Sequence, residues 1–183
     1  MGQIGIDPTI YTTPPSGDGR LPKEMKTYAL LESLGIPFLR LDHGAAATVD
    51  DCQEVEKLLD IHICKNLFLN NAKKTAFYLL MMPGEKRYKA GELSRQIQST
   101  RLSFADAADM ERLLDITPGS VSVLGLMNDK NHEVSLLIDR ELLEEEFIGC
   151  HPCVNTASLK LRMDDLLDKF LPHTGHEPVF VTL

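Results

Sequence analysis

A lysine stands in the middle of an apolar run. Residues 61–69 read Ile-His-Ile-Cys-Lys-Asn-Leu-Phe-Leu, in which large apolar residues recur as they do in a buried strand. This pattern places Lys65 beside core positions. A buried ammonium group costs free energy unless an anion or several acceptors meet it, so the position indicates a ligand. The alternative is a lysine on the solvated face of a half-buried strand.

A second segment, Cys150-His151-Pro152-Cys153, has the CxxC spacing of thiol–disulfide oxidoreductases. That chemistry needs the first cysteine at a helix N-terminus, where the helix dipole lowers the thiol pKa. The sequence after Cys153 is strand-like and polar, and no strand–helix–strand frame precedes the motif. We therefore predict that neither cysteine has a catalytic role.

Metal binding is the other chemistry that these residue types allow. His62 and Cys64, together with the 150–153 segment, would supply enough ligands for zinc if the two segments were neighbours. Nothing in the spacing requires this, and buried cysteines that act as small apolar residues are the simpler interpretation. We predict no metal and no cofactor. No serine lies in an elbow motif with a partner base, so a Ser/His/Asp hydrolase is not indicated.

The composition is that of an ordinary globular protein. The 183 residues are 43% apolar and 25% charged, and they suffice for one domain with a proper core. The longest apolar run, Ala76 to Met82, is far shorter than the roughly 20 residues of a membrane span. No secretory signal is visible at the N-terminus, and four cysteines do not suggest a disulfide scaffold. We expect a cytoplasmic protein with no membrane partner.

Charge is distributed unevenly along the chain. The net charge is −8, which taken alone argues against a nucleic-acid partner. The stretch from Lys65 to Arg101, however, has eight basic residues and two acidic ones, so it carries +6. This basic stretch could form a surface for a phosphate backbone, or it could be an ordinary solvated face. Its basic residues are Lys65, Lys73, Lys74, Lys86, Arg87, Lys89, Arg95 and Arg101.

Helical and strand patterns mix along the chain without regular alternation, which predicts an α+β fold with a mixed β-sheet. The expected helices are 21–34, ending at Gly35, 50–59, capped by Thr48 or Asp50, 90–98, 104–114, 140–145 and 163–170. The expected strands are 36–41, 61–69, 75–82, 120–124, 134–139, 156–161 and 178–181. Residues 1–20 lack an apolar period and are expected to form a flexible or loosely docked extension before a single domain at 21–183.

Three motifs together resemble the YbaK/ProX family of aminoacyl-tRNA deacylases. They are Cys64-Lys65-Asn66-Leu67-Phe68-Leu69, Pro118-Gly119-Ser120-Val121-Ser122 and Gly149-Cys150-His151-Pro152. The chain is most similar to the free-standing prolyl-tRNA editing branch, which resembles the editing insert of bacterial prolyl-tRNA synthetases. The likeness begins near Leu21 and runs to the C-terminus. It implies a mixed sheet, or a partly closed barrel, flanked by helices.

The resemblance implies ester hydrolysis of mischarged tRNA(Pro), with alanine as the most favoured amino acid and cysteine or another small residue as alternatives. The partner would be the mischarged tRNA, with transient contact to prolyl-tRNA synthetase and no DNA. The tRNA's own free 2′-hydroxyl would orient the attacking water. A non-catalytic module that binds tRNA or another nucleotide is the second function class. A deacylation assay separates the two.

The family roles transfer to particular residues. Lys65 would anchor the terminal adenosine through its phosphate or carbonyl, and Gly149 and His151 would form the catalytic loop. The substrate-binding residues implied by the likeness are Asn66, Gly119, Ser120, Val121, Ser122, Pro152 and Asn155.

One expectation about the amino-acid pocket comes from the residue pattern rather than from the family roles. We expect its walls to include residues such as Ile63, Leu126 or Val121. One departure from the family pattern also stands out. Val123 follows Ser122 where a proline is expected, which bears on the shape of the pocket.

Overall fold

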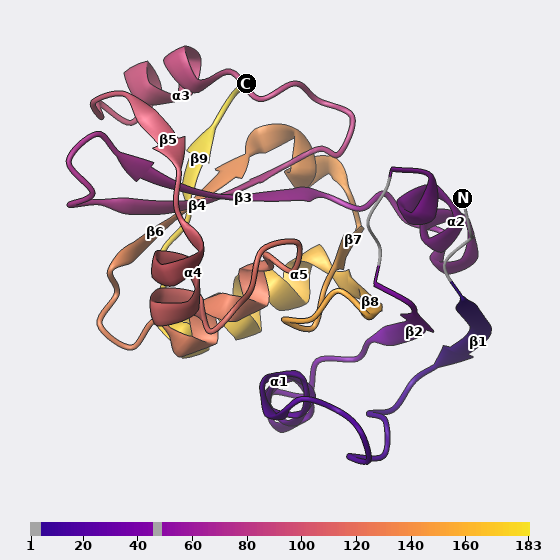
Figure 1. The fold of residues 1–183 in the computed structure, drawn as a ribbon. Helices are drawn as coiled ribbons and strands as arrows, with labels where there is room; N and C mark the ends of the chain where they lie inside the picture. The colour runs from indigo at the N-terminus through magenta and orange to yellow at the C-terminus, as the bar shows by residue number, and fades with distance from the viewer. Residues whose placement is uncertain (1–4, 46–48) are drawn as a thin grey trace.

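A computed structural model describes residues 5–45 and 49–183, with side chains from residue 53 onward in the second range. The described chain folds into two β-sheets and the helices that cover them, so the α+β class is confirmed (Figure 1). The two sheets are separate in this part of the chain, and they do not close into a barrel. No helix among the described residues is long and apolar enough to cross a membrane.

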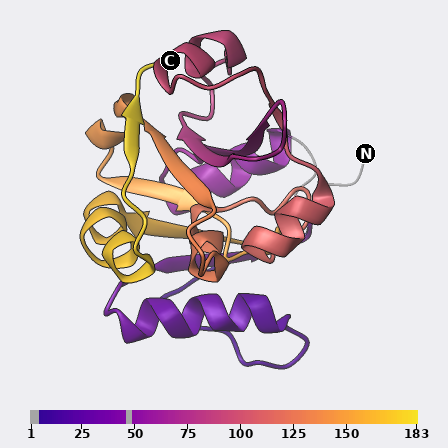
Figure 2. The ribbon, with the colours of Figure 1, turned by 90° about the vertical axis from the view of Figure 1, so that its left-hand side faces the viewer.

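The first sheet is antiparallel throughout, in the order β1-β2-β8-β7. Its strands are β1 (Ile6–Tyr11), β2 (Leu39–His43), β7 (Phe147–Cys150) and β8 (Ala157–Arg162). The central pair β2–β8 is the best buried, with Leu41 and Leu159 inaccessible to solvent. Helix α1 (Pro22–Ser33) lies at this end of the molecule, and Figure 2 shows it opposite α3 (Ala90–Gln96).

The second sheet is mixed, in the order β5-β3-β4-β6-β9. Its strands are β3 (Lys65–Asn71), β4 (Phe77–Met82), β5 (Leu102–Phe104), β6 (Val134–Asp139) and β9 (Val179–Val181). One face packs into the main core, and the other packs under α3. Because both faces are covered, β4 reads as a continuous apolar run rather than an alternating one.

The remaining helices fill the space around the sheets. They are α2 (Val49–Leu59), α4 (Ala107–Leu114), α5 (Met163–Asp165) and α6 (Leu171–Thr174), with the short 3₁₀ helices η1 (Val123–Asn128) and η2 (Arg140–Glu144) and the π-helical segment η3 (Leu166–Phe170). Most of the helices and strands expected from the sequence are present within a few residues. Helix α1 ends as expected at Gly35, whose φ of +62° is a left-handed value that glycine adopts without strain. The proposed Thr48 cap lies outside the described residues.

Three expectations are wrong. Residues 120–124 are not a strand, because Ser122 Oγ accepts a hydrogen bond from the Leu124 amide and opens η1 instead. Phe104 belongs to strand β5 rather than to a helix, because Asp106 caps α4 two residues later. Strand β1 lies within residues 1–20, where no regular element was expected, and pairs with β2. The sequence also gave no sign of β7.

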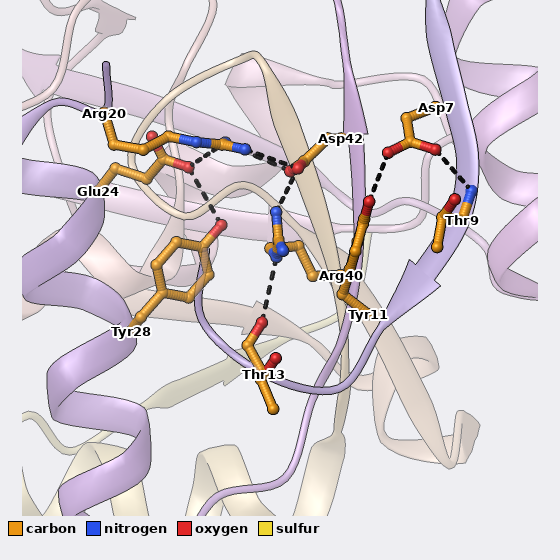
Figure 3. A network of polar contacts seen from close by, with 9 residues as sticks. All are labelled: Asp7, Thr9, Tyr11, Thr13, Arg20, Glu24, Tyr28, Arg40 and Asp42. Carbon is orange, nitrogen blue, oxygen red and sulfur yellow. Dashed lines mark hydrogen bonds and ion pairs between the residues drawn. The ribbon is translucent and has the colours of Figure 1, made fainter. Parts of the chain in front are cut away.

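A polar network fastens the N-terminal segment to the first sheet (Figure 3). Asp42 on β2 receives hydrogen bonds from both Arg40 and Arg20, the latter at 2.6 Å. Arg40 also donates to the Thr13 carbonyl at 3.3 Å, and its guanidinium lies 4.3 Å from the centre of the Tyr11 ring. Arg40 is almost fully buried. Charge-assisted hydrogen bonds therefore help to hold the segment after β1 against the first sheet.

We expect Asp42→Asn to lower the free energy of unfolding by about 1–3 kcal/mol, because it leaves the buried Arg40 guanidinium without its anion. Burial raises the pKa of Asp42, but hydrogen bonds from Arg20 and Arg40 outweigh this and lower it overall. The stabilisation is then present above the unfolded pKa of about 3.9 and is lost as pH falls through the lower folded value. Urea melts between pH 2 and 7 measure both effects. Asp164→Asn, at a largely exposed ion pair, is the control and should change neither.

Candidate active site

A pocket of about 230 Å³ lies where the two sheets meet. Three stretches of chain line it: the segment that enters β3, the loop before η1, and the end of β7. The lining residues are Ile63, Cys64, Asn66, Gly119, Val121, Cys150 and His151. The three motifs that were separate in the sequence therefore converge on one cavity.

A close backbone contact joins the two walls of this pocket. Ile63 forms an isolated parallel bridge with Gly149 of β7. A Cβ atom at Gly149 would lie 2.5 Å from Ile61 Cδ1 and 3.2 Å from Ile63 Cα. Glycine is needed here because any side chain would push the two segments apart.

Asn66 ties β3 to the loop on the other side of the pocket. Its side-chain oxygen accepts a hydrogen bond of 3.1 Å from the Val123 amide, and its Nδ2 donates to the Cys64 carbonyl at 3.3 Å. A proline at position 123 could not make the first bond, because proline has no amide hydrogen. The Val123 departure from the family pattern therefore supplies a donor that positions Asn66.

His151 is half-buried at the pocket wall, and its protonation state follows from its contacts. Its Nδ1 lies 2.8 Å from the Ala157 carbonyl oxygen, which can only accept, so Nδ1 carries the proton and Nε2 is an acceptor in the neutral ring. Burial lowers the pKa of His151 from its usual value; the Ala157 bond opposes this, and the nearby His43 adds to it. The His43 ring centroid is 6.2 Å away. The imidazole is therefore neutral at pH 7.

The cysteines at the site are buried. Cys64 Sγ lies 3.5 Å from the Gly149 carbonyl, and burial raises the pKa of the Cys64 and Cys153 thiols to about 11. Burial also raises the pKa of Cys150 well above its usual value, with the neighbouring Cys64 and Cys153 adding to the shift. Thiols of this kind are the opposite of the low-pKa nucleophiles of redox enzymes.

We expect the double variant Cys150→Ser, Cys153→Ser to keep ester hydrolysis within a few-fold of the wild-type rate. The reason is that protonated, buried thiols neither attack nor leave at neutral pH. Iodoacetamide labelling of the native protein from pH 6 to 9 measures the same property. A thiol that reacts rapidly at pH 7, or a large loss of activity in the variant, would contradict the prediction.

Lys65 does not line the pocket. Its Nζ donates to the Lys86 carbonyl oxygen at 2.8 Å, and the side chain is half-buried. The described partner is thus a carbonyl oxygen, and the role of Lys65 as an anchor for the terminal adenosine stays a prediction. Lys86 itself lies 2.8 Å from both Asp139 and Glu141. Lys65 begins β3 at the pocket end of the strand, one residue away from two lining residues, Cys64 and Asn66.

The other expected site residues are divided between the pocket and its surroundings. Asn66, Gly119, Val121 and His151 line it, and so does Ile63. Five expected residues are not among the lining residues: Gly149, Ser120, Ser122, Pro152 and Asn155. Leu126 is buried in the main core, so Leu126 is wrong as a wall residue. Cys64 and Cys150 line the pocket although no site role was expected for them. The sequence signal that could have identified them as lining residues is that each lies in one of the three motifs.

A metal centre would need several donor side chains close together. Within residues 5–45 and 53–183, no group of three or more His, Cys, Asp or Glu side chains is arranged to hold a metal ion. His62, one of the ligands considered for zinc, has an exposed side chain, whereas Cys64 and Cys150 are buried.

Comparison with known proteins agrees with this arrangement. Residues 43–169 match the model of the aminoacyl-tRNA editing domain. The prolyl-tRNA editing protein ProX of Acetoanaerobium sticklandii is 31% identical over 148 residues, 81% of this chain and 90% of that protein. The prolyl-tRNA synthetase associated domain-containing protein 1 of Danio rerio is 31% identical over 88% of this chain and 87% of its own length.

A solved structure described as a candidate trans-editing enzyme for prolyl-tRNA synthetase shares the fold, with a TM-score of 0.65 and 18% identity over 90% of this chain and 99% of that one. The fold, the pocket and the relatives define an editing hydrolase. The chain belongs to the aminoacyl-tRNA editing domain family, as the YbaK/ProX resemblance indicated. It is an aminoacyl-tRNA deacylase, a hydrolase that acts on ester bonds.

Proposed function

We propose that this deacylase removes a small amino acid, alanine above all, from mischarged tRNA(Pro). The observation that carries the proposal is the pocket of about 230 Å³, which is below the ~300–1,000 Å³ usual for small-molecule sites. Among the described residues, its lining has no acidic or lysine side chain that would favour a charged amino acid. The names of the relatives, a prolyl-tRNA editing protein and a prolyl-tRNA synthetase associated domain-containing protein, support tRNA(Pro) as the substrate. We propose in addition that the chain contacts that synthetase transiently and acts in the cytoplasm.

The need for such an activity follows from the limits of binding. A synthetase pocket shaped for proline cannot strongly reject a smaller side chain, because each missing methylene changes binding by only ~1–3 kcal/mol. A second pocket that admits the smaller residue and excludes proline by size supplies the remaining discrimination. Here Ile63 and Val121 provide branched apolar walls, and Gly149 keeps one wall close to the other.

The chemistry is the hydrolysis of one ester. Water adds to the carbonyl carbon of the aminoacyl group, the bond to the ribose oxygen breaks, and that oxygen takes the proton. The products are the free amino acid and tRNA with an intact ribose. Neutral His151 offers Nε2 as a proton acceptor for the α-ammonium group or for a water at the pocket wall. Lys65, at the pocket end of β3, is proposed to anchor the terminal nucleotide.

The test is single-turnover deacylation of tRNA(Pro) carrying alanine, serine, cysteine or proline. We expect alanine to be released fastest and proline to be spared. Faster release of cysteine or serine would support the deacylase activity but would show that alanine is not the preferred amino acid. Binding of tRNA(Pro) without hydrolysis of any of the four would favour the non-catalytic module instead.

The pH profile of the same reaction reports on His151. Its lowered pKa predicts constant kcat/KM for alanine release around neutral pH and a fall on acidification below the ordinary histidine value of about 6.5, where protonation removes the Nε2 acceptor. His151→Asn should lower the rate and remove that acid limb. A limb that persists unchanged in the variant would assign it to another group. As a control, the rate of spontaneous ester hydrolysis without enzyme is measured at each pH and subtracted.

A further inference from the structure

The second sheet presents an exposed aromatic ring at its edge. Phe104 lies on the edge strand β5, and 64% of its surface is exposed, the largest value among the apolar side chains described as exposed. The ring of Tyr88 lies 5.8 Å away, centre to centre, at an angle of 58°. Tyr88 packs into the small core under α3, so it holds one side of Phe104 in place. The result is a supported ring that is open to solvent.

This ring stands in a definite place relative to the pocket. Phe104 is directly opposite Leu69 of β3, so the two side chains share a face of the sheet. Lys65 is on the same face, because it is four residues from Leu69 along the strand. Four residues of strand span about 13 Å. Lys65, at the end of β3 that is next to the pocket, therefore shares this face of the sheet with the exposed ring, whereas its neighbours Cys64 and Asn66, which line the pocket, alternate to the other face.

Several cations of the basic stretch are available to a ligand. Within the basic stretch, Lys74, Lys86 and Lys89 form ion pairs with acidic side chains. The others have no acidic partner among the described residues, and they are Lys65, Lys73, Arg87, Arg95 and Arg101. Arg87 is next to Tyr88, Arg101 is three residues before Phe104, and both arginines are exposed. A basic, aromatic surface on a protein of net charge −8 matches a phosphate backbone with unpaired bases.

We propose that Phe104, supported by Tyr88 and close in sequence to the exposed Arg87 and Arg101, is a stacking platform for an unpaired base near the 3′ end of the tRNA. This inference rests on the proposed function, because it assumes that the aminoacyl end of that tRNA occupies the pocket. In this arrangement the single-stranded 3′ end of the tRNA leaves the pocket past Lys65, which contacts one of its phosphates. The next unpaired bases of the tRNA then reach Phe104. Stacking of this kind is tolerant of base identity, so the platform adds affinity for a single-stranded end rather than selectivity for tRNA(Pro).

The platform is tested by fluorescence anisotropy with an uncharged acceptor-stem hairpin of tRNA(Pro) that ends in its single-stranded 3′ tail. We expect Phe104→Ala to weaken binding about tenfold and Phe104→Trp to retain it. Leu143→Ala, which removes another exposed apolar side chain, is the matched control and should bind like the wild type. Arg87→Ala and Arg101→Ala should each reduce the slope of log Kd against log salt by about one.

A blunt hairpin without the tail separates stacking from general electrostatics. It should bind the wild type and Phe104→Ala equally, because the base that stacks is missing. Equal binding of the tailed hairpin to both proteins overturns the platform, and so does a tenfold loss that persists with the blunt hairpin. The proposed function is judged separately, by whether the wild type deacylates Ala-tRNA(Pro). An active wild type with an unaffected Phe104→Ala variant rejects the platform alone.

Discussion

Replacing Gly149 with valine should lower kcat/KM for Ala-tRNA(Pro) by about 100-fold. A Cβ atom alone would approach Ile61 Cδ1 to 2.5 Å, Ile63 Cγ1 to 3.0 Å and Ile63 Cα to 3.2 Å. The Ile61 methyl can rotate away, but the Ile63 backbone cannot, so the segment that carries Ile63 and Cys64 into the pocket must shift. A displacement of about 1 Å at a reacting site costs on the order of 10²-fold in rate. Overpacking should also lower the free energy of unfolding by about 1–3 kcal/mol.

The assay is single-turnover deacylation together with a urea melt of each variant. Gly91→Ala is the matched control, because a Cβ atom at Gly91 meets no atom within 4 Å and the position is helical. A second test uses the specific clash. Gly149→Ala should be milder than valine, and adding Ile61→Val, which removes Cδ1, should recover part of the lost activity. A fully active Gly149→Val protein would mean that this cavity is not where the aminoacyl group binds.

Replacing Lys65 with alanine should reduce deacylation about 100- to 1,000-fold while leaving the protein folded. The expected loss is that of one preorganised electrostatic contact to the reacting end of the substrate. The stability change should be small, because the ammonium has one described hydrogen bond, to the Lys86 carbonyl, and the side chain is only half-buried. In the proposed role, the substrate would compete with that carbonyl for the ammonium.

Lys73→Ala is the control for Lys65. Lys73 lies in the turn between β3 and β4, is exposed, and has no acidic partner among the described residues. It should affect binding of tRNA at low salt and leave the single-turnover rate at saturation unchanged. The Lys65 assignment requires the opposite pattern, a loss of rate that saturation does not restore. Near-wild-type hydrolysis by the Lys65→Ala variant would show that Lys65 has no catalytic role.

Local patterns predicted the elements whose two faces differ in polarity or whose ends carry clear signals. Helix α1 ends at Gly35 for a reason visible in the sequence, and β6 has an unambiguous apolar run. Strand β1 was missed because it is a sheet edge with mostly half-exposed and exposed residues, so it has no alternation to detect. Residues 120–124 alternate, but nearly all of them are buried, so the alternation carried no information about backbone shape.

For the site, too, local sequence patterns predicted some features and could not predict others. The convergence of three motifs followed from a family resemblance, since no local pattern relates Asn66 to Val123 or Ile63 to Gly149. The direction of Lys65 could not be predicted because both faces of β3 are buried, and a strand buried on both sides does not show which residues point to which face. The tertiary packing of the two sheets decides it.

The walls of the pocket belong to two different sheets, and the bridge between Ile63 and Gly149 holds them at their spacing. If the pocket selects the amino acid by size, as proposed, that size limit depends on the joint between the sheets. We expect heating toward the melting temperature to loosen this joint before it opens. Editing accuracy should consequently fail at a lower temperature than catalysis, and an organism under heat stress would lose correctly charged tRNA(Pro) to an enzyme that is still active.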